Sequence, residues 1–214
     1  ERTGISEEEG VERLERARAQ MHAARDLRPQ PGRDDKALAA WNGFAIAAFA
    51  DTGRLLNEPA FVARAERIAA FVKEHLMRAD GVLLRSWCGT PGTASGFSDD
   101  YGAVADGLLR LHAATGNLEY LLEARRLTAA AVERFHDAAR GGFYLAANDG
   151  EQLVARTKGV EDTPSPSGSS LIALCLVRLG RIDGNYAWEE LALASVAAVR
   201  AISERAPQAF GSLF

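Results

Sequence analysis

Two pairs of adjacent aspartates are the residues of this chain best suited to chemistry. Asp34-Asp35 and Asp99-Asp100 stand 65 residues apart (99 − 34). Paired carboxylates suit glycoside chemistry, in which one acts as an acid and the other as a base or nucleophile. The alternative is structural, because a carboxylate at the start of a helix accepts hydrogen bonds from free backbone N–H groups. We expect one aspartate of each doublet to cap a helix and the other to be available to a ligand. The two doublets are expected to face a common cavity with Trp41 and Tyr101 as its walls, where their like charges raise the proton affinity of one carboxylate.

An aromatic residue follows each doublet. Trp41 and Tyr101 either belong to the core or stack on a sugar ring, with the indole N–H or phenol O–H as a polar handle. Asn42 stands in an otherwise apolar segment, where a buried amide needs a hydrogen-bond partner. We favour a structural partner for Asn42, with contact to a ligand as the alternative.

A third polar segment, residues 155–168, stands where a doublet would be in the last third of the chain. Ser167 is a suitable N-cap for the apolar helix that follows. Arg156 and Lys158 carry positive charge that either neutralises an acidic rim or binds an anionic substrate.

No metal or cofactor is expected. None of the histidines has a second histidine four positions away, the spacing that places two metal ligands on one helix face. The sequence contains no G-x-S-x-G, P-loop or dinucleotide fingerprint. The four histidines are His22, His75, His112 and His136.

The composition excludes several classes of protein. With 47% hydrophobic and 25% charged residues, the 214-residue chain is globular, and its net charge of −4 offers no basic field for nucleic acid. No apolar run is long enough to span a membrane, and no secretory signal opens the sequence. Cys88 and Cys175 lack metal-ligand spacing and are expected to be reduced thiols of a cytoplasmic protein.

The elements that would position these residues recur along the chain. Gly53, Gly116 and Gly180 each follow an apolar segment and precede an amphipathic one, with spacings of 63 and 64 residues (116 − 53 and 180 − 116). This self-similarity predicts a repeat with two helices in each copy. We expect each glycine to end the first helix of its pair in the left-handed conformation.

The two helices of each copy differ in kind. The first is apolar on nearly all sides and is therefore expected to be an inner, fully buried helix. The second has an apolar stripe and a charged face, as expected of an outer helix. Inner helices are expected near 36–52, 100–114 and 167–179, and outer helices over 61–77, 118–135 and 186–202.

The outer helices allow a sharper prediction. Arg64 and Arg125 should be largely exposed, whereas Ile68 and Leu122 should be buried. Buried arginines at these positions would mean that the inner and outer layers are reversed.

Short β segments are expected between the helix pairs. Residues 81–87 form one, and residues 142–156 read as a hairpin with a turn at Asp149-Gly150. A charged leading helix over 6–27 precedes the pairs. We therefore expect an all-α protein with one helical domain over 1–214, in which the pairs span 36–78, 99–137 and 167–203.

Several strings resemble those of one known family. Residues 34–43 read D-D-K-A-L-A-A-W-N-G, which is similar to the signature of the YyaL family, whose animal member is spermatogenesis-associated protein 20. The further matches are Phe97-Ser98-Asp99-Asp100-Tyr101, Gly141-Gly142-Phe143-Tyr144, Arg156-Thr157-Lys158 with Asp162, and Pro166-Ser167-Gly168.

The resemblance implies an incomplete (α/α) toroid of the six-hairpin glycosidase kind, of which this chain is the middle part. It also implies a thioredoxin-like domain in the full-length protein, and it adds Asp162 to Arg156, Lys158, Trp41 and Asn42 as ligand-binding candidates. A partial ring would leave apolar flanks uncovered, so the chain is expected to self-associate.

Two hypotheses of function follow. In the first, the chain is a carbohydrate-active or carbohydrate-binding toroid, with glycosidase-like chemistry at the doublets if it is an enzyme. Epimerases of this fold use inner-helix histidines, and His112 lies at the wrong end of its helix, so epimerase chemistry is disfavoured. In the second, the chain is a non-catalytic scaffold for a thioredoxin-like domain, and its acidic residues serve as caps and ion pairs.

Overall fold

The computed structural model describes residues 4–150, 155–162 and 164–213. It divides the chain into two compact units, Glu1–Asp35 and Lys36–Phe214, in place of the single domain expected. The first unit holds helix α1 (Glu7–Asp26), which begins at Ser6, whose hydroxyl accepts a hydrogen bond from the N–H of Glu9. α1 has no buried residue, and its apolar side chains Val11, Leu14 and Met21 are exposed.

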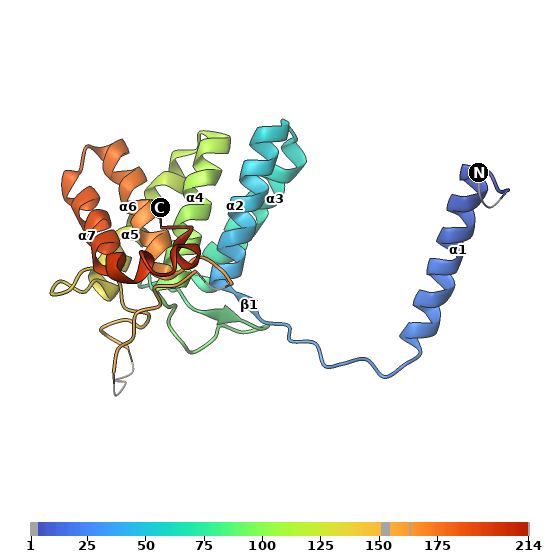
Figure 1. Ribbon diagram of the computed structural model, residues 1–214, viewed down its shortest axis with the longest axis horizontal. Helices are drawn as coiled ribbons and strands as arrows, with labels where there is room; N and C mark the ends of the chain where they lie inside the picture. The colour runs from blue at the N-terminus through green and yellow to red at the C-terminus, as the bar shows by residue number, and fades with distance from the viewer. Residues whose placement is uncertain (1–3, 151–154, 163, 214) are drawn as a thin grey trace. The chain divides into compact units, whose positions relative to one another are not determined.

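The second unit consists of three helix pairs, in which the inner helices are α2 (Ala39–Leu56), α4 (Ser98–Thr115) and α6 (Gly168–Asp183). The outer helices are α3 (Pro59–Phe71), α5 (Leu118–Phe135) and α7 (Tyr186–Ser203), and each packs on the inner helix of its own pair. α4 packs between α2 and α6 (Figure 1). Helix makes up 63% of the chain, as an all-α toroid requires.

Close approach of backbones holds the inner helices together. A Cβ added at Gly43 of α2 would lie 2.6 Å from the backbone nitrogen of Val104 in α4, and one at Gly107 of α4 would lie 2.6 Å from the carbonyl oxygen of Gly43. At the next interface, a Cβ on Gly168 of α6 would lie 2.7 Å from the nitrogen of Asp99. Only glycine fits at such contacts, so the positions of these glycines set the spacing of the inner layer.

The expectation about the repeated glycines is correct for one of the three. Gly116 ends α4 with a left-handed φ of 71°. Gly53 and Gly180 instead lie inside α2 and α6, whose left-handed caps are Asn57 and Gly184. A Cβ at Gly53 would lie 2.6 Å from Cγ2 of Val62 on the outer helix. Gly53 is therefore required for helix packing within the pair rather than for a turn.

The outer helices follow the predicted pattern of burial except on α5, where the buried face is rotated by one residue from the predicted one. Arg64 is exposed and Ile68 is half-buried against the core. Leu122, expected to be buried, is 58% exposed, and its neighbour Leu121 is buried in its place. Arg125 is half-buried because it pairs with Asp183 of α6 at 2.6 and 2.7 Å. The apolar stripe of α5 thus starts one residue earlier than predicted.

The β structure is smaller than expected. β1 (Ala37–Leu38) pairs with β2 (Ser86–Trp87) in an antiparallel two-stranded sheet. Of the hairpin expected over 142–156, residues 151–154 lie outside the described residues, and the described part contributes an isolated bridge between His136 and Phe143. The final turn of α3 continues as a π-helix, η1 (Val72–Leu76), and a short 3₁₀ helix, η2 (Pro207–Phe210), follows α7.

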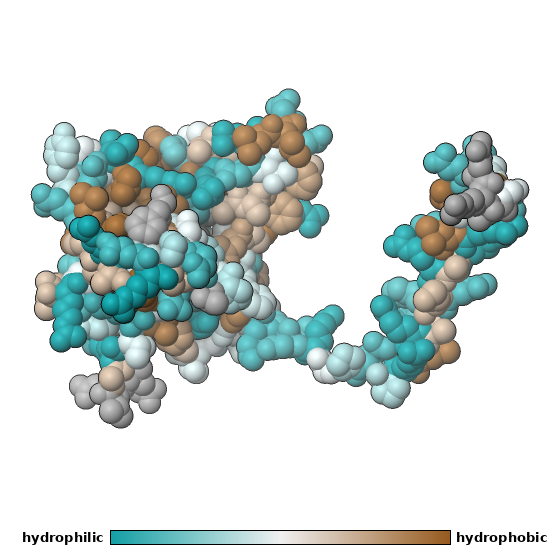
Figure 2. Space-filling view, viewed as in Figure 1, coloured by the Kyte–Doolittle hydropathy of each residue, from teal (hydrophilic) through white to brown (hydrophobic). Residues whose placement is uncertain are grey.

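The core lies between the inner and outer layers. Its largest fully buried side chains include Tyr101, Phe135, Phe143, Ile46 and Leu176. Among the described residues, no helix has the length and apolar character needed to cross a membrane. Apolar side chains also reach the surface, and Figure 2 shows brown patches over the ends of α2 and α3 away from the loops, where Leu55 is 70% exposed.

Candidate functional site

The inner helices begin at the end of the second unit where the connecting loops gather (Figure 1). Asp100, in the first turn of α4, is fully buried there. Its Oδ1 accepts a hydrogen bond of 2.9 Å from the N–H of Ala40, at the start of α2. Its Oδ2 accepts one of 2.9 Å from the N–H of Phe97 and one of 2.7 Å from Nη1 of Arg85. Asp100 therefore caps two helices at once, which confirms the capping role expected of one aspartate in this doublet.

Asp99 is the accessible member of the doublet. Its side chain is 30% exposed, and both of its oxygens lie 3.3 Å from Nη1 of Arg85. Arg85 in turn stacks over the ring of Phe97, with its Cζ 4.7 Å from the ring centroid. One guanidinium therefore bridges a buried carboxylate and a solvent-facing one.

The two carboxylates differ in their proton affinity. Burial and the neighbouring negative charge of Asp99 together raise the pKa of Asp100 to about 6, against the opposing effect of Arg85. A like-charge effect was expected between the doublets, and the structure places it within one doublet. Asp100 is buried, and its oxygens accept the capping hydrogen bonds. Asp99 is therefore the accessible carboxylate of the pair.

The first inner helix takes a capping acceptor from the next repeat. α2 starts at Ala39, and its N-cap residue, Leu38, makes no side-chain capping bond, since Asp100 supplies the acceptor from the next repeat. Asp34 and Asp35 belong to the first unit, where both are exposed, and Asp35 pairs with Arg33 at 2.5 Å. That the two doublets face one cavity stays a prediction.

The two aromatic residues have opposite environments. Trp41, in the first turn of α2, is 69% exposed, as a sugar-stacking residue must be. Tyr101 is 1% exposed, and its hydroxyl accepts a hydrogen bond of 3.1 Å from the N–H of Leu83. Of the two alternatives given for Tyr101, the structure therefore has its side chain in the core. Asn42 donates a 2.8 Å bond to the carbonyl of Leu38, which is the structural role favoured for it.

Arg156 and Lys158 enclose the ring of Tyr144. The Cζ of Arg156 is 4.1 Å and the Nζ of Lys158 is 5.1 Å from its centroid. Arg156 also donates to the carbonyl of Ala146 at 2.8 Å, and Lys158 lies 2.7 Å from Oδ2 of Asp137. The Lys158 ammonium and the Tyr144 hydroxyl lower the pKa of Asp137. These side chains line a cavity of about 420 Å³ against α7, apart from the doublet.

Asp162 ties together the start of α6 and the end of the described chain. Its Oδ1 accepts hydrogen bonds from the N–H of Ser167 at 2.8 Å and the hydroxyl of Ser170 at 3.1 Å. Its Oδ2 accepts one from the N–H of Ser212 at 2.7 Å. These contacts give Asp162 a structural role beside Ser167, which caps α6 as expected.

Sequence reasoning missed a line of charges across the inner helices. Arg110 of α4 contacts Asp51 of α2 at 2.5 Å and Asp106 of its own helix at 2.7 Å, and Asp106 also binds Arg178 of α6. A signal was present, because Asp106 and Arg110 are an i, i+4 charged pair inside an otherwise apolar segment.

Comparison with curated proteins decides the relationship that the motifs indicated. The sequence is 34% identical over 199 residues to spermatogenesis-associated protein 20 of Mus musculus and 33% identical to that of Homo sapiens, and each alignment covers 88% of this chain. This chain is a homologue of spermatogenesis-associated protein 20. It spans about a quarter (25%) of the length of these relatives, and the sequence matches no protein-family model.

Solved structures show the fold of this spermatogenesis-associated protein 20 homologue. It matches a family 76 α-mannanase of Bacteroides thetaiotaomicron with a TM-score of 0.64 and 12% identity, covering 81% of this chain and 46% of the mannanase. It matches a cellobiose 2-epimerase of Spirochaeta thermophila with a TM-score of 0.64 and 20% identity, covering 79% and 45%. The fold is therefore that of an (α/α) toroid, as expected.

A third solved structure has the same fold. It is an α-1,6-mannanase of Salegentibacter, described as an inactive variant with two adjacent aspartates replaced by asparagine, in complex with α-1,6-mannotriose. The TM-score is 0.61 with 16% identity, and the match covers 76% of this chain and 46% of that enzyme.

Proposed function

We propose that this chain forms part of a carbohydrate-active toroid, in which Trp41 stacks on a sugar ring and Asp99 is the acid–base carboxylate. The observation that carries the proposal is the exposure of both side chains at the same end of two neighbouring inner helices. Trp41 lies in the first turn of α2 and Asp99 in the first turn of α4, and the two helices pack together. Packed helices stand about 8 to 10 Å apart, which a single sugar residue can bridge.

The chemistry of the doublet is consistent with this assignment. Arg85 holds Asp99 in place, and Asp100 anchors Arg85 from the buried side. A fixed carboxylate next to an aromatic platform is what a glycosidic oxygen needs for proton transfer. The similar α-1,6-mannanase described as inactive lacks the charges of two adjacent aspartates, which supports a role for such a doublet in this fold.

Saccharide titrations of the 214-residue chain test the proposal, with the heat of binding in isothermal titration calorimetry as the readout and α-1,6-mannotriose and cellobiose as probes. We expect Trp41→Ala to abolish binding. The matched control is Leu122→Ala, which removes a comparably exposed apolar side chain from an outer helix and should leave binding unchanged.

The catalytic part of the proposal has its own variant. Asp99→Asn should keep saccharide binding while lowering any turnover by about 100-fold or more, the usual contribution of a general acid or base. Wild-type binding that survives Trp41→Ala, together with turnover that survives Asp99→Asn, would remove both residues from the site.

The second candidate function is a non-catalytic scaffold, partnered with the thioredoxin-like domain that the family resemblance implies. One observation favours it: every oxygen of Asp100 is engaged by backbone N–H groups and Arg85, as in a purely structural cap. In this case the Asp99→Asn and Trp41→Ala variants would leave the properties of the chain unchanged.

We also propose a cytoplasmic location. Cys88 is an exposed free thiol, and free thiols on protein surfaces persist in reducing compartments. Alkylation of Cys88 by a membrane-permeant maleimide in intact cells should be complete, whereas protection that reductant reverses would indicate an oxidising compartment.

A further inference from the structure

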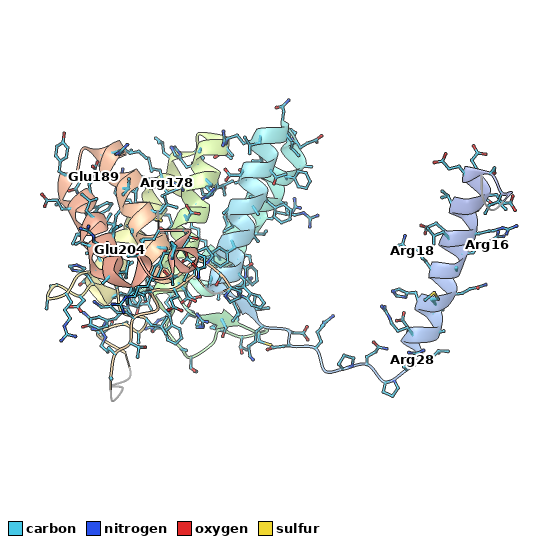
Figure 3. All side chains as sticks on the ribbon, in the orientation of Figure 1. Arg16, Arg18, Arg28, Arg178, Glu189 and Glu204 are labelled. Atoms are coloured by element: carbon cyan, nitrogen blue, oxygen red, sulfur yellow. The ribbon has the colours of Figure 1, made fainter. Side chains whose placement is uncertain are left out.

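A pocket of about 440 Å³ lies at the C-terminal ends of the three inner helices, away from the proposed carbohydrate site. Figure 3 shows Arg178 near this end of α6, opposite the loops. The ten residues from Asp100 to Arg110 correspond to about 15 Å along α4, so the two sites are separate. The charged or titratable lining residues are Asp51 and Arg54 of α2, Arg110 and His112 of α4, and Arg178 and Arg181 of α6.

Two carboxylates hold the arginines at the base of this pocket. Asp51 lies 2.5 Å from Arg110 and 3.8 Å from Arg54. Asp106, which is 5% exposed, pairs with both Arg110 and Arg178. Because these partners fix the guanidinium groups of Arg110 and Arg178, little side-chain entropy remains to be lost when a ligand binds.

The pocket carries more positive than negative charge. Four arginines line it, and Asp51 and Asp106 are the two carboxylates within this network. Glu189 of α7 lies 3.9 Å from Arg181, at the limit of an ion pair, and does not line the pocket. His112 bonds the carbonyl of Asn117 through Nδ1. Each guanidinium has five N–H donors, of which the network engages only some.

Helix dipoles account for two of the four arginines that line the pocket. Arg54 and Arg181 stand in the last turns of α2 and α6, where a positive charge is favoured. Arg110 and Arg178 lie further from the helix ends, so the dipole does not account for their presence. Their ion pairs with Asp51 and Asp106 hold both guanidinium groups at one pocket.

We propose that this pocket binds the oxyanion group of a small molecule, a phosphate or a carboxylate. Guanidinium groups match the geometry of both oxyanions and bind them with two parallel hydrogen bonds. The remaining lining, which includes Leu109, Ala113 and Ile182, is apolar and suits the organic part of such a ligand. The site does not depend on the proposed carbohydrate function.

Isothermal titration of the 214-residue chain with inorganic phosphate tests this site. Sodium acetate in a second titration distinguishes a carboxylate from a phosphate source, and sodium chloride at equal ionic strength removes the general effect of salt. The informative variant is Arg54→Gln with Arg181→Gln, because these side chains are 48% and 75% exposed and their loss leaves the buried network intact. We expect its phosphate affinity to fall about tenfold or more.

The control removes the same amount of charge elsewhere. Arg67→Gln with Arg200→Gln alters exposed side chains of α3 and α7 and should leave phosphate affinity at the wild-type value. Equal phosphate affinities of the two double variants would overturn the proposal. So would heats of phosphate and acetate titration into the wild-type chain that equal the heat of the chloride titration. The proposed carbohydrate function is tested with a different variant, Trp41→Ala, and a different ligand. The carbohydrate proposal and the oxyanion proposal can therefore fail independently.

Discussion

The carboxylate of Asp100 accepts a hydrogen bond from the backbone N–H of Ala40, 60 residues earlier in the chain, at 2.9 Å. A residue of the second inner helix thereby caps the first. Leu38, the N-cap residue of α2, makes no side-chain capping bond, and the bond from Ala40 to Asp100 joins two helix pairs through a helix terminus as well as through packed side chains.

Removal of this cap should be costly. Asp100→Ala leaves the N–H groups of Ala40 and Phe97 and the guanidinium of Arg85 without their acceptor, and we expect the free energy of unfolding to fall by about 3 kcal/mol. Urea denaturation measures it. Asp99→Ala, in the adjacent and partly exposed position, should cost less than about 1 kcal/mol. Equal losses in the two variants would contradict the special role of Asp100.

The raised pKa of Asp100 predicts a pH dependence. Its pKa is 3.8 ordinarily and about 6 in the fold, so between these values the folded chain binds the proton more readily than the unfolded chain does. The contribution of Asp100 to stability is therefore fully present below pH 3.8 and is lost as the pH rises through about 6, by about 3 kcal/mol in all. Denaturation of wild type and Asp100→Asn across this range isolates the effect, because asparagine does not titrate. A stability difference independent of pH would contradict the assignment.

The glycine contacts between inner helices predict intolerance to one methyl group. Gly43→Ala places a Cβ against the backbone of α4 and should lower the free energy of unfolding by about 2 kcal/mol or more. Gly32→Ala is the matched control, because a Cβ there would meet no atom within 4 Å. Thermal unfolding of both variants tests this, and a Gly43→Ala variant with wild-type stability would mean that the helices can move apart freely.

Exposed apolar side chains predict self-association. Leu55 and Leu56 are 70% and 64% exposed at the end of α2. We expect sedimentation velocity to show association that grows with concentration, and Leu55→Glu with Leu56→Glu to shift the chain towards monomer. A strictly monomeric wild-type chain at high concentration would count against it.

The sequence was sufficient for the repeat and for the layer of each helix, because apolar periodicity depends on neighbours close in the chain. It was insufficient wherever the deciding partner is distant. Tyr101 and Trp41 occupy similar places in their repeats, yet Tyr101 is buried under the loop at Leu83, whereas Trp41 is 69% exposed. Likewise, the helix that Asp100 caps in addition to its own could not be known without the position of Ala40.

The bond between Ala40 and Asp100 also bears on synthesis. A ribosome adds about 5 to 20 residues per second, so the 60 residues between the two positions take about 3 to 12 seconds to make. Throughout that interval the N–H of Ala40 in the nascent α2 lacks this acceptor. A chain whose translation stalls before residue 100 therefore holds α2 without the cap that the next helix pair supplies.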